Sequence, residues 1–236
     1  MMNISNLIEN IGLSDINFSE EELFVLAMTH SSYAIDNDLG KLSNNERLEF
    51  YGDAVLKLSC SKFLYENFTS ENEGILSKYR SVLVSDNFLT KYADDINLEK
   101  FLLVGNRPDL KNKKVLESLK ACAFEALLGA IFIQTSFDIV YERFLKQFFI
   151  KYTSFVKENL EKINSKAILQ EFTQAKSKQL PKYELIEKKG KDYECVFIVS
   201  VKYNDIEVGR GSGSTKKEAE QAAAYEACIK LGAINE

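Results

Sequence analysis

Three acidic side chains stand close together in the segment that covers residues 44–56. Glu46, Glu49 and Asp53 are spaced so that on a helix they fall within roughly 60° of one another. Carboxylates on one stripe repel each other unless they are fully solvated or share a cation. Their hard oxygen atoms suit Mg²⁺ or Mn²⁺. On spacing alone, however, an ordinary solvated helix face is the more common explanation.

A fourth acid, Glu125, lies in the most apolar stretch of the chain, residues 121–133. Burying an unpaired carboxylate is unfavourable, so Glu125 needs a positively charged partner. A Lys or Arg side chain could serve, and so could a metal ion shared with the first three acids. Such an ion would polarise a phosphoryl oxygen, generate hydroxide and stabilise the leaving 3′ oxygen, which is metal-assisted phosphodiester hydrolysis.

The elements that would position these acids change in type along the chain. Helical periodicity with short polar breaks runs up to about Phe155. After Ser165 the pattern indicates one helix over 166–177, three β-branched and aromatic runs, and a last helix from about Thr215, in the order α-β-β-β-α. The predicted limits are 1–156 for an all-α domain, 157–164 for a charged linker and 165–236 for a small α+β domain.

The start of the last helix has the features of a phosphate site. Thr215 and Glu218 have the spacing of a capping box, and Lys216 and Lys217 stand in the first turn. Backbone N–H groups, the positive helix end and two ammonium groups would converge on one spot. Taken alone, the same residues also fit an ordinary capped helix with solvated lysines.

Composition narrows the possible classes of protein. The 236-residue chain has a net charge of −5, which argues against binding nucleic acid through bulk charge. No apolar stretch is long enough to span a bilayer, and the acidic N-terminus lacks the basic start and apolar core of an export signal. The cysteines form no C-x-x-C pair and fit reduced thiols. We expect a cytoplasmic protein with no membrane partner and no small-molecule cofactor.

Four blocks of the sequence resemble the ribonuclease III family, and the likeness covers nearly the whole chain. Residues 46–56, ERLEFYGDAVL, closely resemble the family signature ERLEFLGDAVL. Residues 29–33 (THSSY), 73–80 (EGILSKYR) and 121–130 (ACAFEALLGA) resemble three further blocks in the same order. The resemblance implies the bacterial arrangement, an all-α nuclease domain followed by an α+β double-stranded-RNA-binding domain.

This resemblance also implies an activity and a set of site residues. The protein would be a homodimeric, Mg²⁺-dependent endonuclease that cuts double-stranded RNA to 5′-phosphate products in ribosomal and messenger RNA processing. Glu49, Asp53 and Glu125 would form the metal cluster, with Asp53 and Glu125 as the catalytic residues. Glu46 and Glu73 would be supporting acids near the subunit interface or in the outer shell of the site.

The role of two residues, Cys122 and His30, does not follow directly from the family pattern. Cys122 stands where the family carries an aspartate, three residues before Glu125, and a thiol is a poor ligand for Mg²⁺. The remaining acids could hold the ion with reduced affinity, the site could prefer Mn²⁺ or a softer ion, or catalysis could be lost. We favour retained activity because the other acids of the motifs all remain.

His30 could be taken for a general base, but a packing or hydrogen-bonding role fits the family better.

Two rivals to the enzyme stay open. The first is a non-catalytic protein that binds double-stranded RNA and keeps the nuclease fold, and Cys122 is the feature that supports it. The second is a structural helical dimer with an incidental acid stripe on its surface.

The second domain resembles double-stranded-RNA-binding domains at residues 169–174 (LQEFTQ) and 211–223 (GSGSTKKEAEQAA). The first helix and the loop between the first two strands would each reach a minor groove, and the start of the last helix would contact the phosphates between them. In that loop the family often has a histidine where this chain has a tyrosine. The residues implied are Thr173, Gln174, Tyr193, Thr215, Lys216 and Lys217.

Overall fold

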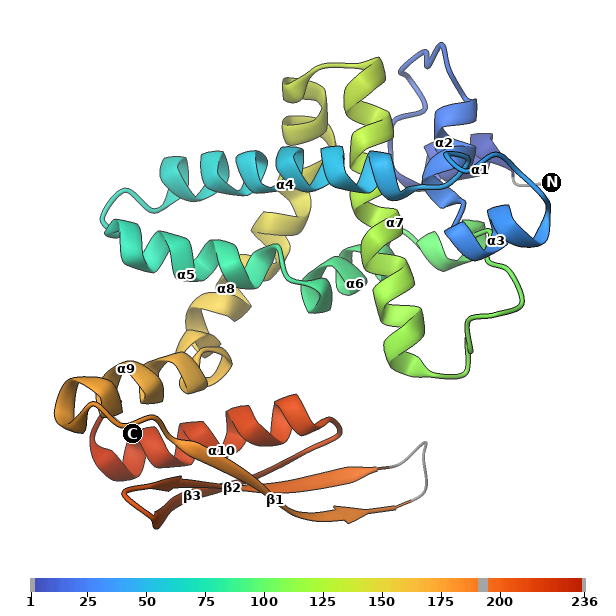
Figure 1. Cartoon of the computed structure of the whole chain (residues 1–236). Coiled ribbons are helices and arrows are strands. Elements are labelled where there is room, and N and C mark those ends of the chain that lie inside the picture. Colours follow the sequence, from blue (N-terminus) through green and yellow to red (C-terminus); the bar gives the residue numbers. More distant parts are fainter. Residues whose placement is uncertain (1–2, 191–194, 235–236) are drawn as a thin grey trace. The chain divides into compact units, whose positions relative to one another are not determined.

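The computed structural model describes residues 3–190 and 195–234 of the chain (Figure 1). The chain divides into two compact units, Met1–Ser154 and Phe155–Glu236. The first unit is helical and the second has the order helix, three strands, helix, so the predicted fold class is confirmed. Within the described ranges, no helix combines the length and the apolar character that crossing a membrane requires.

Helices build the described part of the first unit, together with one isolated bridge between Thr29 and Leu103. Short helices come first and two long ones, α4 and α7, dominate the middle of the unit. The elements are α1 Ile4–Asn10, α2 Glu22–Met28, α3 Ser31–Asp36, α4 Glu46–Asn67, α5 Glu73–Leu83, α6 Asp86–Asp95, the 3-10 helix η1 Leu98–Phe101, α7 Lys113–Gln134 and the π-helix η2 Ile139–Leu145. Helix α8, Lys146–Ile163, begins in this unit and ends in the second.

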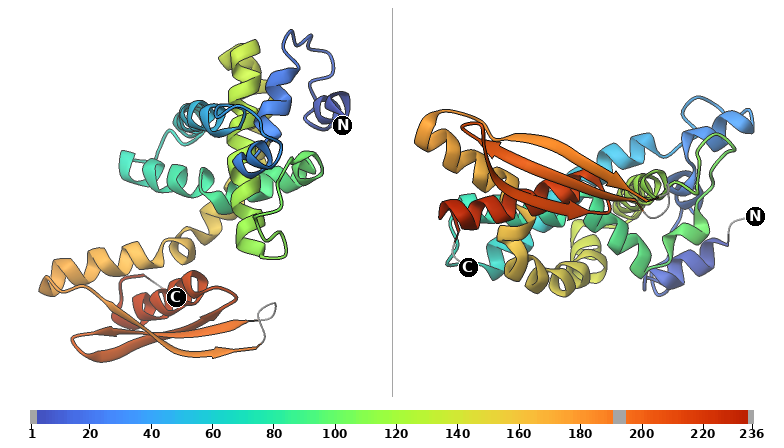
Figure 2. Two further views of the ribbon diagram at one scale, coloured as in Figure 1. Left: turned by 45° about the vertical axis from the view of Figure 1, so that its right-hand side comes forward. Right: turned by 90° about the horizontal axis from the view of Figure 1, so that it is seen from below.

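The central helix of this unit is α7. It is apolar around most of its circumference, and all six residues from Ala126 to Ile131 are buried. A helix that is apolar on all sides must lie inside the unit. Accordingly α2, α4 and α6 all pack against it, and α4 crosses it in the views of Figures 1 and 2.

Aromatic side chains fill the core between α6, α7 and α8. Phe124 of α7 lies 5.6 Å, between ring centroids, from Tyr92 of α6 and 5.7 Å from Phe148 of α8. Tyr92 is buried, and its hydroxyl donates a hydrogen bond to the Leu83 carbonyl at 2.9 Å, so its polar atom is satisfied. This core holds α6 and α7 in a fixed relation.

The second unit is a three-stranded antiparallel sheet in the order β1-β2-β3, with both helices on one face (Figures 1 and 2). A Cβ at Gly211 would lie 2.1 Å from the Ala223 backbone nitrogen, so glycine lets the last helix approach the sheet. Leu169, Val199 and Val201 complete a small core. The elements are α9 Ser165–Ser177, β1 Lys182–Lys189, β2 Val196–Tyr203, β3 Ile206–Gly213 and α10 Lys216–Leu231.

The predicted linker at 157–164 is helical over most of its length, because residues 157–163 form the last turns of α8. Lysine and glutamate favour a helix as readily as an open linker, so charge alone did not distinguish the two. The division between the units falls between Ser154 and Phe155. The predicted limits of the two domains stay a prediction.

Candidate functional site

Helices α4 and α7 cross in near backbone contact because a glycine of each helix faces the other. A Cβ at Gly52 would lie 1.8 Å from the Glu125 carbonyl oxygen, and one at Gly129 would lie 2.4 Å from a carbonyl oxygen of α4. No side chain fits at either place. The crossing, which Figure 1 shows, therefore brings the backbone of Glu125 against Gly52, in the part of α4 that carries Glu49 and Asp53.

Glu125 is partly buried among negative charges. Burial, followed by the carboxylates of Asp53, Glu49 and Asp86, raises the pKa of Glu125 to about 8, and the ammonium of Lys57 offsets part of this effect. A carboxyl group with this pKa holds a proton at neutral pH. A cation placed among these groups would favour its ionised form.

The Cys122 thiol faces Glu49 across the crossing. Burial, and then the charge of Glu49, raise the pKa of Cys122 to about 12, so the thiol stays protonated. Burial also raises the pKa of Glu49, and hydrogen bonding with Cys122 partly offsets that rise. At this position the chain therefore has a neutral hydrogen-bond donor where the resembling family has a negative charge.

Asp53 already has a cationic neighbour. The Lys57 Nζ atom lies 2.7 Å from Asp53 Oδ2, one helical turn further along α4. Both side chains are substantially exposed, so the pair contributes little to folding stability. It does place one positive charge at the edge of the acidic cluster.

Asp86 belongs to the same cluster, and the sequence analysis did not single it out. It is exposed and begins α6, and its charge raises the pKa of Glu49, Cys122 and Glu125. The start of a helix at Ser85 and Asp86 was visible in the sequence. The closeness of that helix end to α4 and α7 has no signature in residue spacing.

The chemistry of this donor set fits a hard divalent cation. The charges of Asp53, Glu49 and Asp86 act on Glu125, Lys57 offsets only part of them, and the raised pKa of Glu125 reflects the excess of negative charge. Among residues 3–190 and 195–234, no three acidic, cysteine or histidine side chains gather closely enough to hold one ion directly. An ion would therefore be held partly through water, as is usual for Mg²⁺.

The remaining predicted acids lie further out. Glu46 is exposed and its charge raises the pKa of Glu49, so it borders the cluster. Glu73 begins α5, is exposed, and accepts a hydrogen bond from the Ser77 hydroxyl at 2.7 Å. The part that Glu73 plays at a subunit interface stays a prediction.

His30 has a local structural role. Its ring Nδ1 accepts a hydrogen bond from the Ser32 backbone N–H at 3.1 Å and caps α3. Burial lowers the pKa of His30, which favours the neutral ring that this cap uses. The geometry agrees with the hydrogen-bonding role expected from the sequence.

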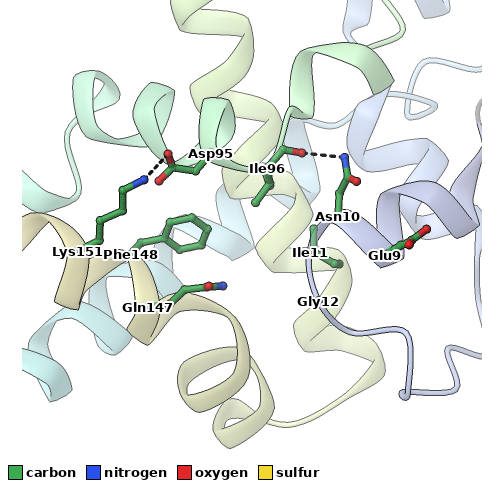
Figure 3. A pocket seen from close by; sticks show the side chains of 9 residues that line it. All are labelled: Glu9, Asn10, Ile11, Gly12, Asp95, Ile96, Gln147, Phe148 and Lys151. Carbon is green, nitrogen blue, oxygen red and sulfur yellow. Dashed lines mark hydrogen bonds and ion pairs between the residues drawn. The ribbon is translucent and has the colours of Figure 1, made fainter.

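A separate hollow of about 340 Å³ lies between α1, α6 and α8 (Figure 3). Two polar pairs lie in its wall: Lys151 pairs with Asp95 at 2.6 Å, and the Asn10 amide donates to the Ile96 carbonyl at 3.1 Å. None of the predicted site residues lines it. We therefore place the chemistry at the α4–α7 crossing.

The start of α10 has the predicted form. The Glu218 backbone N–H donates to the Thr215 hydroxyl at 3.1 Å, and the Glu218 carboxylate accepts from the Thr215 N–H, so the capping box is present. Lys216 and Lys217 are exposed in the first turn. Two ammonium groups and the positive helix end thus face solvent together.

On α9, one predicted contact conflicts with the structure. Thr173 is fully buried, and its hydroxyl donates to the Leu169 carbonyl at 2.9 Å, so it packs within the unit and does not face RNA. Gln174 is exposed, as is Gln170 one turn earlier, which the sequence analysis missed. The four-residue spacing between Leu169 and Thr173 could have revealed the buried face. Tyr193 lies outside the described residues.

Two family models match the chain and agree with these two units. The model described as ribonuclease-III-like matches residues 20–153, and the model of the double-stranded RNA binding motif matches residues 165–231. Fold and site thus define a class of protein, a double-strand-specific endoribonuclease with its own RNA-binding domain.

Similar proteins of known name cover nearly the whole chain. Ribonuclease 3 of Natranaerobius thermophilus is 36% identical over 97% of this chain and 96% of its own length. Ribonuclease 3 of Corynebacterium efficiens is 39% identical over 98% of this chain and 90% of its own length. The chain belongs to the ribonuclease III family.

Two solved structures are similar to the first unit. The nuclease domain of ribonuclease III from Campylobacter jejuni is 33% identical with a TM-score of 0.55, covering 64% of this chain and 97% of that domain. A second structure of that domain is 34% identical with a TM-score of 0.52, covering 59% of this chain and 92% of that one. It is described as flexible in a region involved in dimer formation.

Proposed function

We propose that this protein cleaves double-stranded RNA by hydrolysis that depends on a divalent metal ion, leaving 5′ phosphates. The observation that carries the proposal is the α4–α7 crossing, which gathers Glu49, Asp53 and Glu125 with an excess of negative charge. Mg²⁺ or Mn²⁺ bound there would polarise a phosphoryl oxygen, supply hydroxide and stabilise the leaving 3′ oxygen.

The side chains of this crossing divide the work. Glu49, Asp53 and Glu125 would hold the cation, and Glu125 would bind it in its ionised form, because the pKa of about 8 applies to the metal-free site. Cys122 stays protonated and orients the Glu49 carboxylate. Lys57, which pairs with Asp53 at 2.7 Å, would compete with the ion for that carboxylate.

Duplex RNA is held by the second unit. The exposed lysines at the start of α10, Lys216 and Lys217, contact phosphates together with the Thr215 turn. Gln174 and Gln170, both exposed and four residues apart on α9, reach 2′-hydroxyl groups in a minor groove. Contacts of this kind respond to A-form shape more than to base sequence, and they weaken as salt rises.

An exposed apolar stripe on α4 supports a homodimer. Phe50 is 81% exposed, Leu58 58% and Tyr65 76%. On a helix these three fall within roughly 80° of one another, and an apolar patch of this kind marks an interaction surface. A second copy of the chain is the partner we propose, in line with the dimer-forming region described for the Campylobacter jejuni domain.

The proposed substrates follow from the resemblance to the family, and the proposed location follows from the composition of the chain. Precursors of ribosomal RNA and structured messenger RNA are the proposed substrates, and the cytoplasm is the proposed location. RNA sequencing of cells that lack the protein would test the substrates, and fractionation of cells would test the location.

Cleavage of a perfect RNA duplex tests the proposed activity. We expect 5′-phosphate products with Mg²⁺ or Mn²⁺ and none with a chelator, because the carboxylates need the ion. Gel retention of the same duplex at low salt gives binding independently. Retention without product in either metal would instead favour a non-catalytic protein that binds double-stranded RNA. Absence of retention as well would favour a purely structural helical dimer.

A further inference from the structure

We propose that Lys57 is a phosphate-binding residue of the nuclease site, and that its ammonium group holds an oxygen of the phosphate at the cleavage point. This inference rests on the proposed function and deepens it, because it names the group of the substrate that Lys57 contacts. Lys57 directly follows the motif at residues 46–56 and is not part of it.

Lys57 continues the row of acids along α4. Glu49, Asp53 and Lys57 follow one another at intervals of four residues, so each is turned by about 40° from the one before it. Residues with this spacing lie on one face of a helix. The ammonium group therefore stands at the end of the row of carboxylates that would hold the cation.

The structure places the Lys57 ammonium group directly on a carboxylate of the site. Its Nζ atom donates a hydrogen bond to Asp53 Oδ2 at 2.7 Å. The Lys57 side chain is 55% exposed, and that of Asp53 is 37% exposed. A lysine side chain is a flexible four-carbon stem with three donors at its end, so it can turn to a new acceptor while the helix stays in place.

Lys57 loses its carboxylate partner when a cation binds Asp53. Two positive charges on one carboxylate repel each other, so the ammonium group needs another negative partner. The substrate phosphate brings negative charge to the same place, and lysine binds phosphate as a compact point charge. Lys57 therefore passes from Asp53 to a phosphate oxygen, where its charge offsets the negative charge that develops during hydrolysis.

The alternative explanation is an ordinary ion pair that only stabilises α4. Pairs of opposite charge four residues apart are common on helices, and exposed ones contribute little. Lys62 is the matched case, because it pairs with Glu66 on the same helix with the same spacing. Lys62 stands nine residues after Asp53, so it is on the opposite face and roughly 13 Å further along the helix axis.

Binding of a short product duplex measures the proposed contact without cleavage. The full-length protein is titrated in Mg²⁺ with a synthetic duplex equal to the final cleavage product, made once with a 5′ phosphate and once with a 5′ hydroxyl. We expect the wild type to bind the 5′-phosphate duplex more tightly, and this preference to fall about tenfold in Lys57→Met. Lys62→Met should keep the preference of the wild type.

Mn²⁺ affinity of the RNA-free protein gives a second measurement. Because Lys57 competes with the ion for Asp53, Lys57→Met should bind Mn²⁺ at least as tightly as the wild type does, as measured by electron paramagnetic resonance. Weaker Mn²⁺ binding in folded Lys57→Met would mean that Lys57 only builds the site, and would overturn the inference. Thermal unfolding of each variant checks that it is folded.

Two further results would overturn the inference while leaving the proposed function intact. The first is the same preference for the 5′ phosphate in folded Lys57→Met as in the wild type. The second is a wild type with no such preference, since no phosphate would then be held beside Lys57. A wild type that cuts no long duplex in either metal would contradict the proposed function itself, and the inference with it.

Discussion

At the scale of single residues, the site is governed by the proton on Glu125. Burial and three neighbouring carboxylates raise its pKa to about 8, so binding of a cation at neutral pH must displace that proton. The same burial makes Cys122 a neutral donor with a pKa of about 12. Burial and the neighbouring carboxylates thus explain both why Glu125 needs a cation and why the protonated Cys122 thiol does not replace a carboxylate.

This proton predicts how metal affinity depends on pH. Below the pKa of Glu125 the metal-free site is protonated, so Mn²⁺ affinity should rise by up to about tenfold per pH unit and level off above about pH 8. Mn²⁺ titrations across this range measure it, and Glu125→Gln, which carries no titrating group, is the control. Constant wild-type affinity between about pH 6 and about pH 8 would contradict the assignment.

Sequence reasoning found most of the cluster and missed one member. Helical spacing placed Glu49 and Asp53 on one face, and the apolar surroundings of Glu125 indicated that it needed a cation. Asp86 was missed because only the packing of α6 on α7 brings it near. The prediction that Thr173 contacts RNA was wrong, because it followed the family motif and did not consider which face of the helix is buried.

At the scale of elements, the α4–α7 crossing fixes the site. A Cβ at Gly52 would lie 1.8 Å from the Glu125 carbonyl oxygen, so Gly52→Ala must push the two helices apart. We expect a loss of stability of about 1–3 kcal/mol or more, with loss of duplex cleavage. Urea unfolding and a cleavage assay measure the two effects.

A matched helical glycine controls for the change from glycine to alanine itself. A Cβ at Gly74 of α5 would meet only the Asn72 side-chain oxygen at 3.3 Å. Gly74→Ala should therefore lose much less stability than Gly52→Ala, because a side-chain oxygen can shift where a helix backbone cannot. Equal stability of Gly52→Ala and the wild type would show that the helices do not touch where we place the contact.

The two ends of α10 should differ in their importance for RNA. Lys217 stands at the positive helix end, so Lys217→Ala should weaken binding to unrelated duplexes by similar factors. The slope of the logarithm of the binding constant against the logarithm of the salt concentration should fall by about one, because one phosphate contact is lost. Lys230, in the last turn of the same helix, is the control. Gel retention over a series of salt concentrations measures both. A loss confined to one duplex sequence would contradict shape recognition.

The elements themselves were largely predictable. A run of β-branched residues predicted β2, and a capping box predicted the start of α10, because both patterns are local. The end of the first domain was less predictable from the sequence, because the charged residues 157–163 suit a helix and a linker equally well. Which helices cross, and where, depends on long-range packing that no local pattern records.

At the scale of the whole molecule, the apolar stripe on α4 predicts a homodimer. Phe50 is its most exposed member at 81%, and a charge there would oppose burial against a second copy. Phe50→Asp should therefore shift the protein from dimer to monomer in sedimentation velocity runs. Leu110→Asp, at another exposed leucine (49%), should leave the dimer intact. A Phe50→Asp protein that sediments as the wild type does would place the interface elsewhere.

Cleavage by Glu125→Gln tests the central claim most directly, because the amide keeps the shape of the side chain and removes its charge. We predict that duplex RNA is retained as by the wild type, while single-turnover cleavage falls by about a thousandfold or more, as a loss of about 4 kcal/mol of transition-state stabilisation implies. Product formation within a few-fold of the wild-type rate would contradict the claim that carboxylates of α4 and α7 share a catalytic metal ion.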